Sequence, residues 1–139
     1  MKSLSPFCIS AYLIHQQKYL LIRRCSSYLN GTWQMISGGV EENETAIIAA
    51  LREMKEETGI IPDRFYSADT VETFYFAKQD KILVVPVFVG FIDSMKEVVL
   101  SPTEHDAYEW LSFEEAHERL NFAEQKRVLS HIHHQFVLK

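Results

Sequence analysis

The first third of the chain predicts two antiparallel strands followed by a loop. Residues 7–14 and 18–24 are rich in apolar and aromatic side chains, and the polar segment 15–17 between them is typical of a hairpin turn. Turn signals at Asn30-Gly31 and Gly38-Gly39 flank a short apolar segment at residues 33–36. We therefore expect a hairpin and then a loop that contains one short strand.

A helix is predicted over residues 44–58, because apolar positions recur there with the helical period. The positions expected to face the core are Ile47, Ala50, Leu51 and Met54. Asn43 is the expected N-cap, and Gly59, with Pro62 beyond it, is expected to end the helix. This is the clearest helical pattern in the chain.

The remaining segments predict a mixture of strands and helices in one domain. The expected elements are a hairpin of residues 65–77 and 81–92, short strands at 98–100 and 108–111, and helices at 113–120 and 122–136. Hairpins in mixed order, rather than alternating βαβ units, favour an α+β fold. No repeat or low-complexity linker divides residues 1–139, so a single domain is expected.

Composition narrows the class of protein. With 139 residues, 47% hydrophobic and 24% charged, the chain has the make-up of a globular domain, and no window approaches the roughly 18 apolar residues of a membrane helix. A net charge of -5 argues against nucleic acid as a partner, but it allows a small anionic substrate whose charge a metal neutralises. Because Cys8 and Cys25 cannot make a disulfide framework, a reducing, cytoplasmic location is expected.

Three glutamates on the predicted helix point to a metal site. Glu53, Glu56 and Glu57 have i, i+3, i+4 spacing, so they project within about a 100° arc and repel one another unless a cation lies between them. Clustered hard oxygen ligands suit Mg²⁺ or Mn²⁺. Arg52 precedes Glu56 by four residues and is expected to pair with it and fix its orientation.

The glycines before this helix strengthen that interpretation. Gly38 and Gly39 let the backbone approach a metal or phosphate closely, and a helix N-terminus adds positive potential. An acidic run on a helix is usually only a solvated face. Here, however, seven Gly, Glu and Arg positions recur in a fixed pattern, which chance would produce in fewer than about one in a million chains.

Residues 38–60 match the signature of the Nudix hydrolases, which the chain resembles through these 23 of its 139 residues. The resemblance implies an α/β/α sandwich around a mixed sheet and Mg²⁺-dependent hydrolysis of a nucleoside diphosphate linked to another group. It also implies that Glu53, Glu56 and Glu57 hold the metals, that Arg52 orients them, and that a backbone carbonyl near Ser37 joins in.

The flanks of this motif are similar to the branch of small Nudix enzymes that hydrolyse dATP or dihydroneopterin triphosphate. The similar segments are residues 21–24, 31–34 and 103–111. The chain departs from the family at Ser37, where proline is common, and at Asn43, where glycine is frequent. Neither departure removes a carboxylate.

Candidates for additional site residues lie outside the motif. Glu104, in a polar loop, is predicted to add a metal ligand from outside the helix or to serve as general base, with a solvated loop glutamate as the alternative; His105 is interpreted as its neighbour. The predicted substrate-binding residues are Arg23 and Arg24 for phosphates, Trp33 or Tyr28 for stacking, and Gly38 and Gly39. Core packing is favoured for Phe74, and solvent exposure for His131, His133 and His134.

The reaction implied by the resemblance is Mg²⁺-dependent attack of water on phosphorus, which cleaves a nucleoside or pterin triphosphate to a monophosphate and pyrophosphate. Two alternatives stay open: a hydrolase of dinucleoside polyphosphates or ADP-sugars, and a nucleotide-sensing domain without catalysis. Three mutually repelling carboxylates argue against the second alternative. The expected partner is a small nucleotide-like substrate, with no membrane or nucleic acid, and the chain is expected to be a monomer or homodimer.

Overall fold

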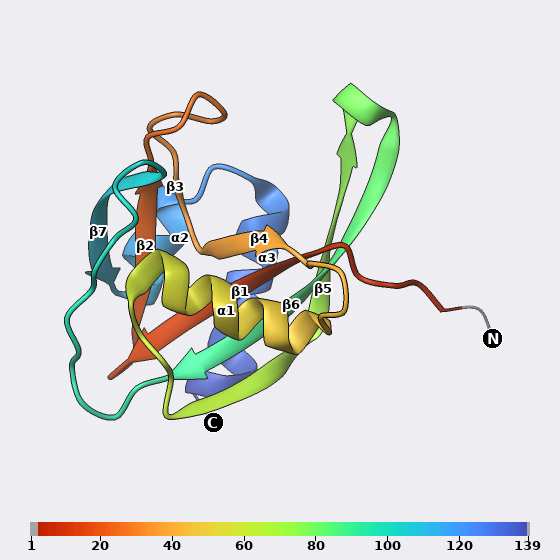
Figure 1. Cartoon of the computed structure of the whole chain (residues 1–139). Coiled ribbons are helices and arrows are strands. Elements are labelled where there is room, and N and C mark those ends of the chain that lie inside the picture. The colour runs from red at the N-terminus through yellow and green to blue at the C-terminus, as the bar shows by residue number, and fades with distance from the viewer. Residues whose placement is uncertain (1–2, 139) are drawn as a thin grey trace.

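The computed structural model describes residues 3–138 and places one mixed β-sheet between two layers of helix (Figure 1). The strands are β1 (Cys8–His15), β2 (Lys18–Arg24), β3 (Trp33–Gln34), β4 (Ile36–Gly39), β5 (Arg64–Phe76), β6 (Lys81–Phe91) and β7 (His105–Leu111). The helices are α1 (Ala46–Thr58), α2 (Phe113–Arg119) and α3 (Ala123–Ile132). Both predicted hairpins are confirmed.

The sheet is built around β1. The strand order is β3-β2-β1-β6-β5, with β4 paired to β1 and β7 paired to β2. Only β1 and β6 run parallel, whereas the other pairs are antiparallel. Because β4 pairs along the first half of β1, it brings residues 36–39 directly beside the sheet centre.

Two hydrophobic cores lie on opposite faces of the sheet. Alternate residues of β1 divide between them: Ile9, Ala11 and Leu13 pack toward α1, whereas Tyr12 and Ile14 pack toward α2 and α3. This alternation is the pattern of a strand buried on both faces. The α+β sandwich expected from the sequence is therefore confirmed.

Helix α1 begins two residues later than predicted. The backbone of Asn43 is left-handed (φ 68°), and the N-cap is Thr45, whose side-chain oxygen accepts a hydrogen bond from the Ile48 amide. Asn43 was therefore the wrong cap, because residues 41–44 form a turn of their own, with the Glu44 amide bonded to the Glu41 carbonyl. The predicted end is confirmed: Gly59 has φ 74° and its N–H donates to the Lys55 carbonyl.

The face that α1 turns to the sheet also differs from the prediction. Ile47 is 44% exposed, and the buried positions of the helix are Ala49, Ala50, Met54, Glu57 and Thr58. The predicted inward positions are therefore confirmed at Ala50 and Met54 and wrong at Ile47, whereas Leu51 is half-buried. The helix is rotated so that a glutamate, rather than Ile47, faces the interior, which is the first structural sign of a functional role for this face.

The second half departs from prediction in three places. Residues 98–100 form no strand: the Val99 amide donates to the Thr58 carbonyl, so the segment covers the end of α1 instead of joining the sheet. Strand β7 begins at residue 105 rather than 108. Helix α3 covers 123–132 of the predicted 122–136 and continues as a π-helical turn, His133–Val137.

The C-terminal histidines have packing roles that were not predicted. The His133 ring stacks on Phe113 with 4.1 Å between ring centroids, and its Nδ1 lies 2.9 Å from the Tyr19 hydroxyl. His131 Nε2 lies 2.7 Å from the Ala68 carbonyl oxygen. Solvent exposure was therefore wrong for these two rings and right only for His134.

The β5–β6 hairpin extends beyond the sandwich as an arm (Figure 1). Its pairing shifts register between Ser67 and Val71, so that residues 71–76 pair with 81–86 in the arm. Among residues 3–138, no helix is long and apolar enough to cross a membrane. Cys8 and Cys25 are both free thiols.

Candidate active site

Helix α1 presents its three glutamates at graded depths. Glu57 is buried, with 2% of its surface exposed, and faces the sheet. The Glu53 side chain is 15% exposed, whereas that of Glu56 is 58% exposed. The predicted common face is present, and it runs from the interior at Glu57 to solvent at Glu56.

The carboxylate of Glu57 is strongly perturbed. Burial, followed by the negative charge of Glu53 and of Glu104, raises its pKa to about 9, while the Ser37 backbone acts in the opposite direction. Its Oε2 atom is buried and has no hydrogen-bond partner among the described residues. A buried acid without compensation costs free energy in the protein alone, which is typical of a site built for a cation.

His105 lies behind this carboxylate. Its Nε2 is 3.7 Å from Glu57 Oε1 and 3.4 Å from Gln34 Nε2, and the ring is 3% exposed. Burial and the positive charge of Arg24 lower the His105 pKa, while burial raises that of Glu57. Burial thus disfavours the charged form of both groups.

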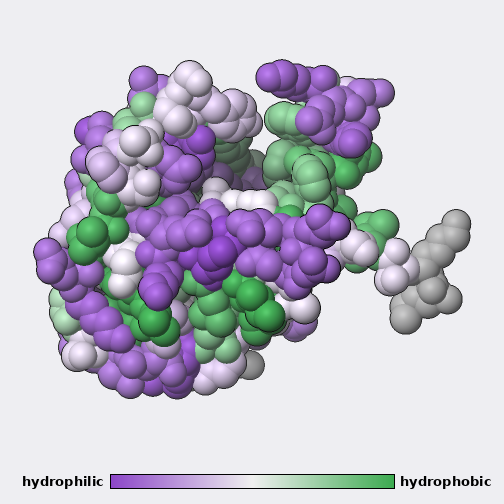
Figure 2. Space-filling view, in the orientation of Figure 1, coloured by the Kyte–Doolittle hydropathy of each residue, from purple (hydrophilic) through white to green (hydrophobic). Residues whose placement is uncertain are grey.

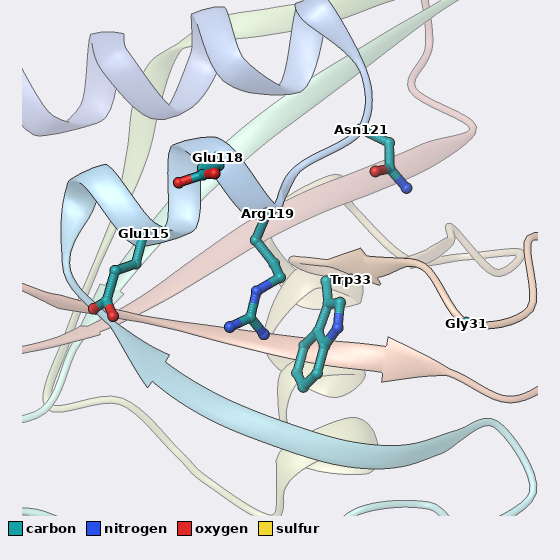
Figure 3. Close-up of a pocket in the computed structure, with 6 residues that line it drawn as sticks. All are labelled: Gly31, Trp33, Glu115, Glu118, Arg119 and Asn121. Atoms are coloured by element: carbon teal, nitrogen blue, oxygen red, sulfur yellow. The ribbon is translucent and has the colours of Figure 1, made fainter.

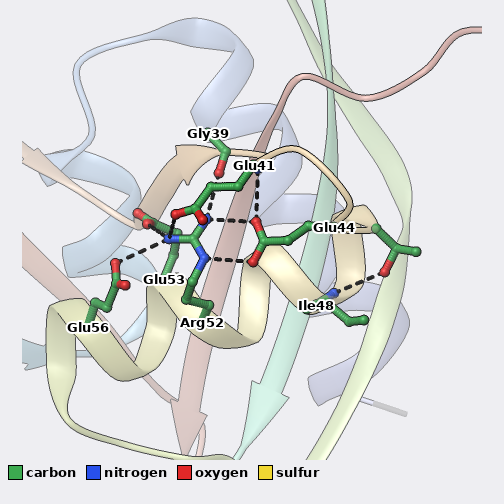
Figure 4. A network of polar contacts seen from close by, with 8 residues as sticks. Gly39, Glu41, Glu44, Ile48, Arg52, Glu53 and Glu56 are labelled. Carbon is green, nitrogen blue, oxygen red and sulfur yellow. Dashed lines mark hydrogen bonds and ion pairs between the residues drawn. The ribbon is translucent and has the colours of Figure 1, made fainter.

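Arg52 is the centre of a polar network along the exposed side of α1 (Figure 4). Its guanidinium donates to Glu44 from Nε (2.7 Å) and Nη2 (3.0 Å), to Glu53 Oε1 (2.6 Å) and to the Gly39 carbonyl (2.9 Å). The predicted contact with Glu56 is present but longer, at 3.2 Å. The pKa of Arg52 is raised chiefly by the bond to Glu44, so this guanidinium stays charged.

The main partner of Arg52 was not predicted from the sequence. Glu44 lies eight residues earlier, outside the spacing of helical neighbours, and reaches Arg52 because the turn at residues 41–44 folds back over the helix. The only sequence signal was that Glu44 belongs to the spaced motif. Arg52 thus ties this turn, strand β4 and the helix together.

We expect Arg52→Lys to lower kcat at least about tenfold, because an ammonium cannot reproduce the forked contacts with Glu44 and Glu53. Steady-state kinetics would measure the loss. The matched control is Arg64→Lys, which alters an exposed ion pair with Asp93 (2.6 Å) and should change kcat less than about twofold. If the two variants have equal kcat, Arg52 forms only a surface ion pair and has no orienting role.

Gly38 lies against the Glu53 carboxylate. A Cβ at position 38 would collide with the Glu53 side chain, whereas at Gly39 the nearest atom to an added Cβ is 3.9 Å away. Gly38 therefore leaves space for a carboxylate, and Gly39 contributes its carbonyl to Arg52. The sequence predicted that the backbone at Gly38 approaches a metal or phosphate closely. In the structure, the group that lies against Gly38 is the Glu53 side chain.

An aromatic cleft opens beside the glutamates, between the loop at residues 25–32 and the β5–β6 arm (Figure 2). The cleft has a volume of about 350 Å³, and Ser37 of β4 belongs to its wall. The aromatic residues that line it are Tyr28, Phe74, Tyr75, Phe76 and Phe122. Phe74 is 41% exposed, so the core position favoured for it was wrong. Such rings suit a flat heteroaromatic ligand.

The predicted phosphate-binding arginines occupy different settings. Arg24 lines the aromatic cleft and is held by hydrogen bonds to the Tyr28 carbonyl (2.8 Å) and the Ser26 hydroxyl (2.9 Å). Arg23 instead forms an exposed pair with Asp106 at 2.8 Å. The structure thus places Arg24, but not Arg23, beside Tyr28 in the cleft.

Trp33 lines a separate hollow (Figure 3). The Arg119 guanidinium lies 4.7 Å from the centre of its ring system, and Arg23 lies 5.8 Å away on the same ring. The other residues around this hollow are Gly31, Glu115, Glu118 and Asn121. Trp33 is therefore not brought together with Tyr28 and Phe74.

Glu104 immediately precedes β7, in an exposed turn. Its amide donates to the Ser101 carbonyl, and its carbonyl accepts from the Cys25 amide, so the turn is fixed to the end of β2. Its negative charge is among the causes that raise the pKa of Glu57, after burial and Glu53. Within residues 3–138, no three His, Cys, Asp or Glu side chains lie close enough together to hold a metal ion as they stand.

Similarity to known proteins agrees with this geometry. The family model for the NUDIX domain matches residues 6–132. The asymmetrical bis(5'-nucleosyl)-tetraphosphatase of Mus musculus is 36% identical over 107 residues, which span 76% of this chain and 71% of that protein. The match therefore extends well beyond the glutamate motif.

Solved structures show the same fold. The Escherichia coli dihydroneopterin triphosphate pyrophosphohydrolase superposes with a TM-score of 0.78 at 23% identity, covering 96% of this chain and 98% of that one. An Ap4A hydrolase of Caenorhabditis elegans, crystallised as a binary complex, gives a TM-score of 0.75 at 25% identity over 90% and 93% of the two chains. The chain belongs to the Nudix hydrolase family, whose enzymes hydrolyse pyrophosphate bonds and generally use a divalent metal.

Proposed function

We propose that this Nudix hydrolase cleaves a nucleoside or pterin triphosphate to the monophosphate and pyrophosphate with Mg²⁺ or Mn²⁺. One observation carries the proposal: Glu57, whose buried Oε2 has no hydrogen-bond partner among the described residues, interacts with the backbone of Ser37 in β4, and Ser37 also lines the aromatic cleft. A substrate with its ring in the cleft would direct its phosphates past Ser37 to the glutamates of α1.

The residues fit a hard divalent cation. The orphaned Glu57 Oε2, together with Glu53 and Glu56, offers an all-oxygen donor set, and we propose that the Ser37 carbonyl adds a neutral ligand. The bound metal supplies charge neutralisation of the polyphosphate and lowers the pKa of the attacking water. Arg52 keeps Glu53 oriented, and Arg24 in the cleft can balance the charge of the phosphates.

We assign the proton transfer to Glu104, because it lies outside helix α1, in the turn before β7, and its negative charge is among the causes that raise the pKa of Glu57. Water attacks one phosphorus, its proton passes to Glu104, and the bond to the bridging oxygen breaks. Glu104→Gln should lower kcat about 10²-fold, as expected for loss of a general base.

Steady-state kinetics at saturating metal would measure the effect of Glu104→Gln. The control is Glu109→Gln, which removes an exposed carboxylate from the following strand, β7, where it pairs with Arg119 at 3.2 Å. If both variants keep the kcat of the unaltered protein, Glu104 has no part in the proton transfer and is a solvated loop residue.

A dinucleoside polyphosphate is the second candidate substrate. It is favoured by the 36% identity over 107 residues to the asymmetrical bis(5'-nucleosyl)-tetraphosphatase of Mus musculus. All the residues of the glutamate motif would serve either substrate, because the motif contacts phosphates rather than bases. ADP-sugars form a third group for the same reason.

A substrate panel tests the proposed function. Nucleoside triphosphates, dihydroneopterin triphosphate, diadenosine tetraphosphate and an ADP-sugar would be incubated with and without Mg²⁺, and products separated by ion-exchange chromatography. Pyrophosphate release from a triphosphate supports the proposal, whereas cleavage of only the dinucleotide into unequal products supports the second candidate. Binding without turnover of any compound would support a sensing domain.

The cellular setting is proposed from the same features. Two free thiols suit a reducing compartment, so we propose a cytoplasmic enzyme that acts on small nucleotide-like molecules as a monomer or homodimer. Analytical ultracentrifugation would decide the oligomeric state.

A further inference from the structure

A second buried carboxylate lies in the aromatic cleft, apart from the glutamate motif. Glu72 of β5 is 5% exposed and lines the cleft together with the aromatic rings. Its Oε1 atom has no hydrogen-bond partner among the described residues. The hydrolytic machinery does not use this residue, so its burial needs another explanation.

The surroundings of Glu72 leave it only partly compensated. Burial, and then the charge of Glu124, raise its pKa, whereas the Ser10 hydroxyl and Arg127 lower it. Arg127 itself is occupied: it donates to the Val71 carbonyl (2.7 Å) and to both oxygens of Glu124 (2.9 Å each). Glu72 therefore has a hydroxyl beside it but no direct cationic partner.

A second unpartnered acceptor shares the cleft. The Oε1 atom of Gln125, near the start of α3, is buried and also has no hydrogen-bond partner. Buried polar atoms are normally satisfied, and two unsatisfied acceptors in one aromatic cleft require donors from elsewhere. A ligand that brings adjacent N–H groups would satisfy them.

We propose that Glu72 is the specificity residue of the cleft and selects a 2-amino-4-oxopyrimidine edge, the edge that guanine and pterin rings share. That edge carries a ring N–H next to an exocyclic NH₂, which matches the two oxygens of a carboxylate in a bidentate pair. The inference rests on the proposed function, since it names the substrate class of the same site.

The adenine edge fits less well. It places one donor, the exocyclic NH₂, beside a ring nitrogen acceptor, which an ionised carboxylate would repel. Inosine retains the ring N–H but lacks the exocyclic NH₂, so it removes half of the proposed pair and nothing else. Comparison of guanine with inosine nucleotides therefore isolates the contact to Glu72.

The test compares kcat/KM for GTP, ITP, ATP and dihydroneopterin triphosphate in the unaltered protein and in Glu72→Gln. One hydrogen bond to a charged group is worth about 10- to 100-fold in binding, so GTP should exceed ITP by that factor. Glu72→Gln should bring the ratio within about threefold of one, because the amide offers a donor where the carboxylate offers an acceptor. The ratio of GTP to the pterin substrate distinguishes the two sources of the edge.

Glu109→Gln is the matched control. It removes an exposed carboxylate that pairs with Arg119 (3.2 Å) and does not line the cleft, so the ratio of GTP to ITP should persist. A ratio near one in the unaltered protein, a preference for ATP, or an equal loss in both variants would overturn the inference. Circular dichroism melting of each variant would establish that it folds, and the ratio in the unaltered protein needs no variant.

Equilibrium binding separates this inference from the proposed function. Calorimetric titration with GMP, IMP and AMP requires no turnover. If GMP binds about 10-fold or more tightly than IMP while no triphosphate is hydrolysed, the base selection stands and the proposed function fails. If GTP and ITP are hydrolysed equally well and GMP and IMP bind equally, the proposed function stands and the base selection fails.

Discussion

Replacement of Glu57 by glutamine is expected to lower kcat by about 10³-fold or more while the metal-free protein becomes more stable. Glu57 is the most deeply buried of the three glutamates, and its Oε2 lacks any other partner. The variant loses the ligand charge that a metal would neutralise, and it also loses a buried acid that the fold otherwise leaves uncompensated. Steady-state kinetics and thermal unfolding in EDTA would measure the two effects.

The stability effect should depend on pH in one direction. The pKa of Glu57 is about 9 in the folded chain and 4.5 as the ordinary value, so the folded state binds more protons between these values. The stabilisation that comes from this raised pKa is fully present below about pH 4.5. As the pH rises toward 9, it is lost, and the unfolding free energy falls by up to about 1.4 kcal/mol per pH unit. Unfolding free energy in EDTA should fall over this range, and Glu57→Gln should flatten the curve.

Magnesium supplies the control for this prediction. Mg²⁺ should raise the unfolding temperature of the unaltered protein most at high pH, where the carboxylate is forced to ionise, and should raise that of Glu57→Gln much less. Equal pH profiles for the two proteins in EDTA, or full activity of the variant, would contradict a metal-binding role.

Gly38→Ala is expected to lower kcat about 10²-fold with a change in unfolding free energy of no more than about 1 kcal/mol. The added Cβ collides with the end of the Glu53 side chain, which can move aside without disturbing the core. Displacing a catalytic carboxylate by about 1 Å is enough for such a loss of rate. Kinetics and urea unfolding of the same preparation would measure both quantities.

Gly39→Ala provides the neighbouring control. Its added methyl has no atom closer than 3.9 Å, and the carbonyl that Arg52 binds is retained, so kcat should fall no more than about threefold. If the two alanine variants lose activity equally, the effect comes from stiffening of strand β4 and not from displacement of Glu53.

Much of the fold followed from local pattern. The hairpins in residues 7–24 and 65–92 and the end of the helix at Gly59 were predicted correctly, because these features depend on neighbours in sequence. Residues 98–100 were placed wrongly in a strand, since their apolar character serves to cover the end of α1. Only the three-dimensional arrangement distinguishes those two uses of an apolar segment.

In the candidate site, too, some features followed from the sequence and others depended on the three-dimensional arrangement. The spacing of Glu53, Glu56 and Glu57 predicted a shared face, yet it contained nothing about depth, and depth is what raises the pKa of Glu57. The contact of Arg52 with Glu44 depends on a left-handed turn at Asn43 that propensity does not predict. Glu72 gave no signal at all, because a lone glutamate in a strand is recognised as unusual only when its burial is known.

The hairpin arm separates the residues of the aromatic cleft from the carboxylates of the glutamate motif. Residues 71–76, beyond the register shift in β5, supply Glu72 and three aromatic rings of the cleft, whereas the carboxylates of the motif stand on a helix packed against the sheet centre. Under the base selection proposed above, substitutions in the arm would exchange one base for another without altering the groups proposed to bind phosphate. Related enzymes could therefore acquire new substrates by substitutions at the dozen positions of the arm, residues 71–76 and 81–86, while the residues of the glutamate motif stay the same.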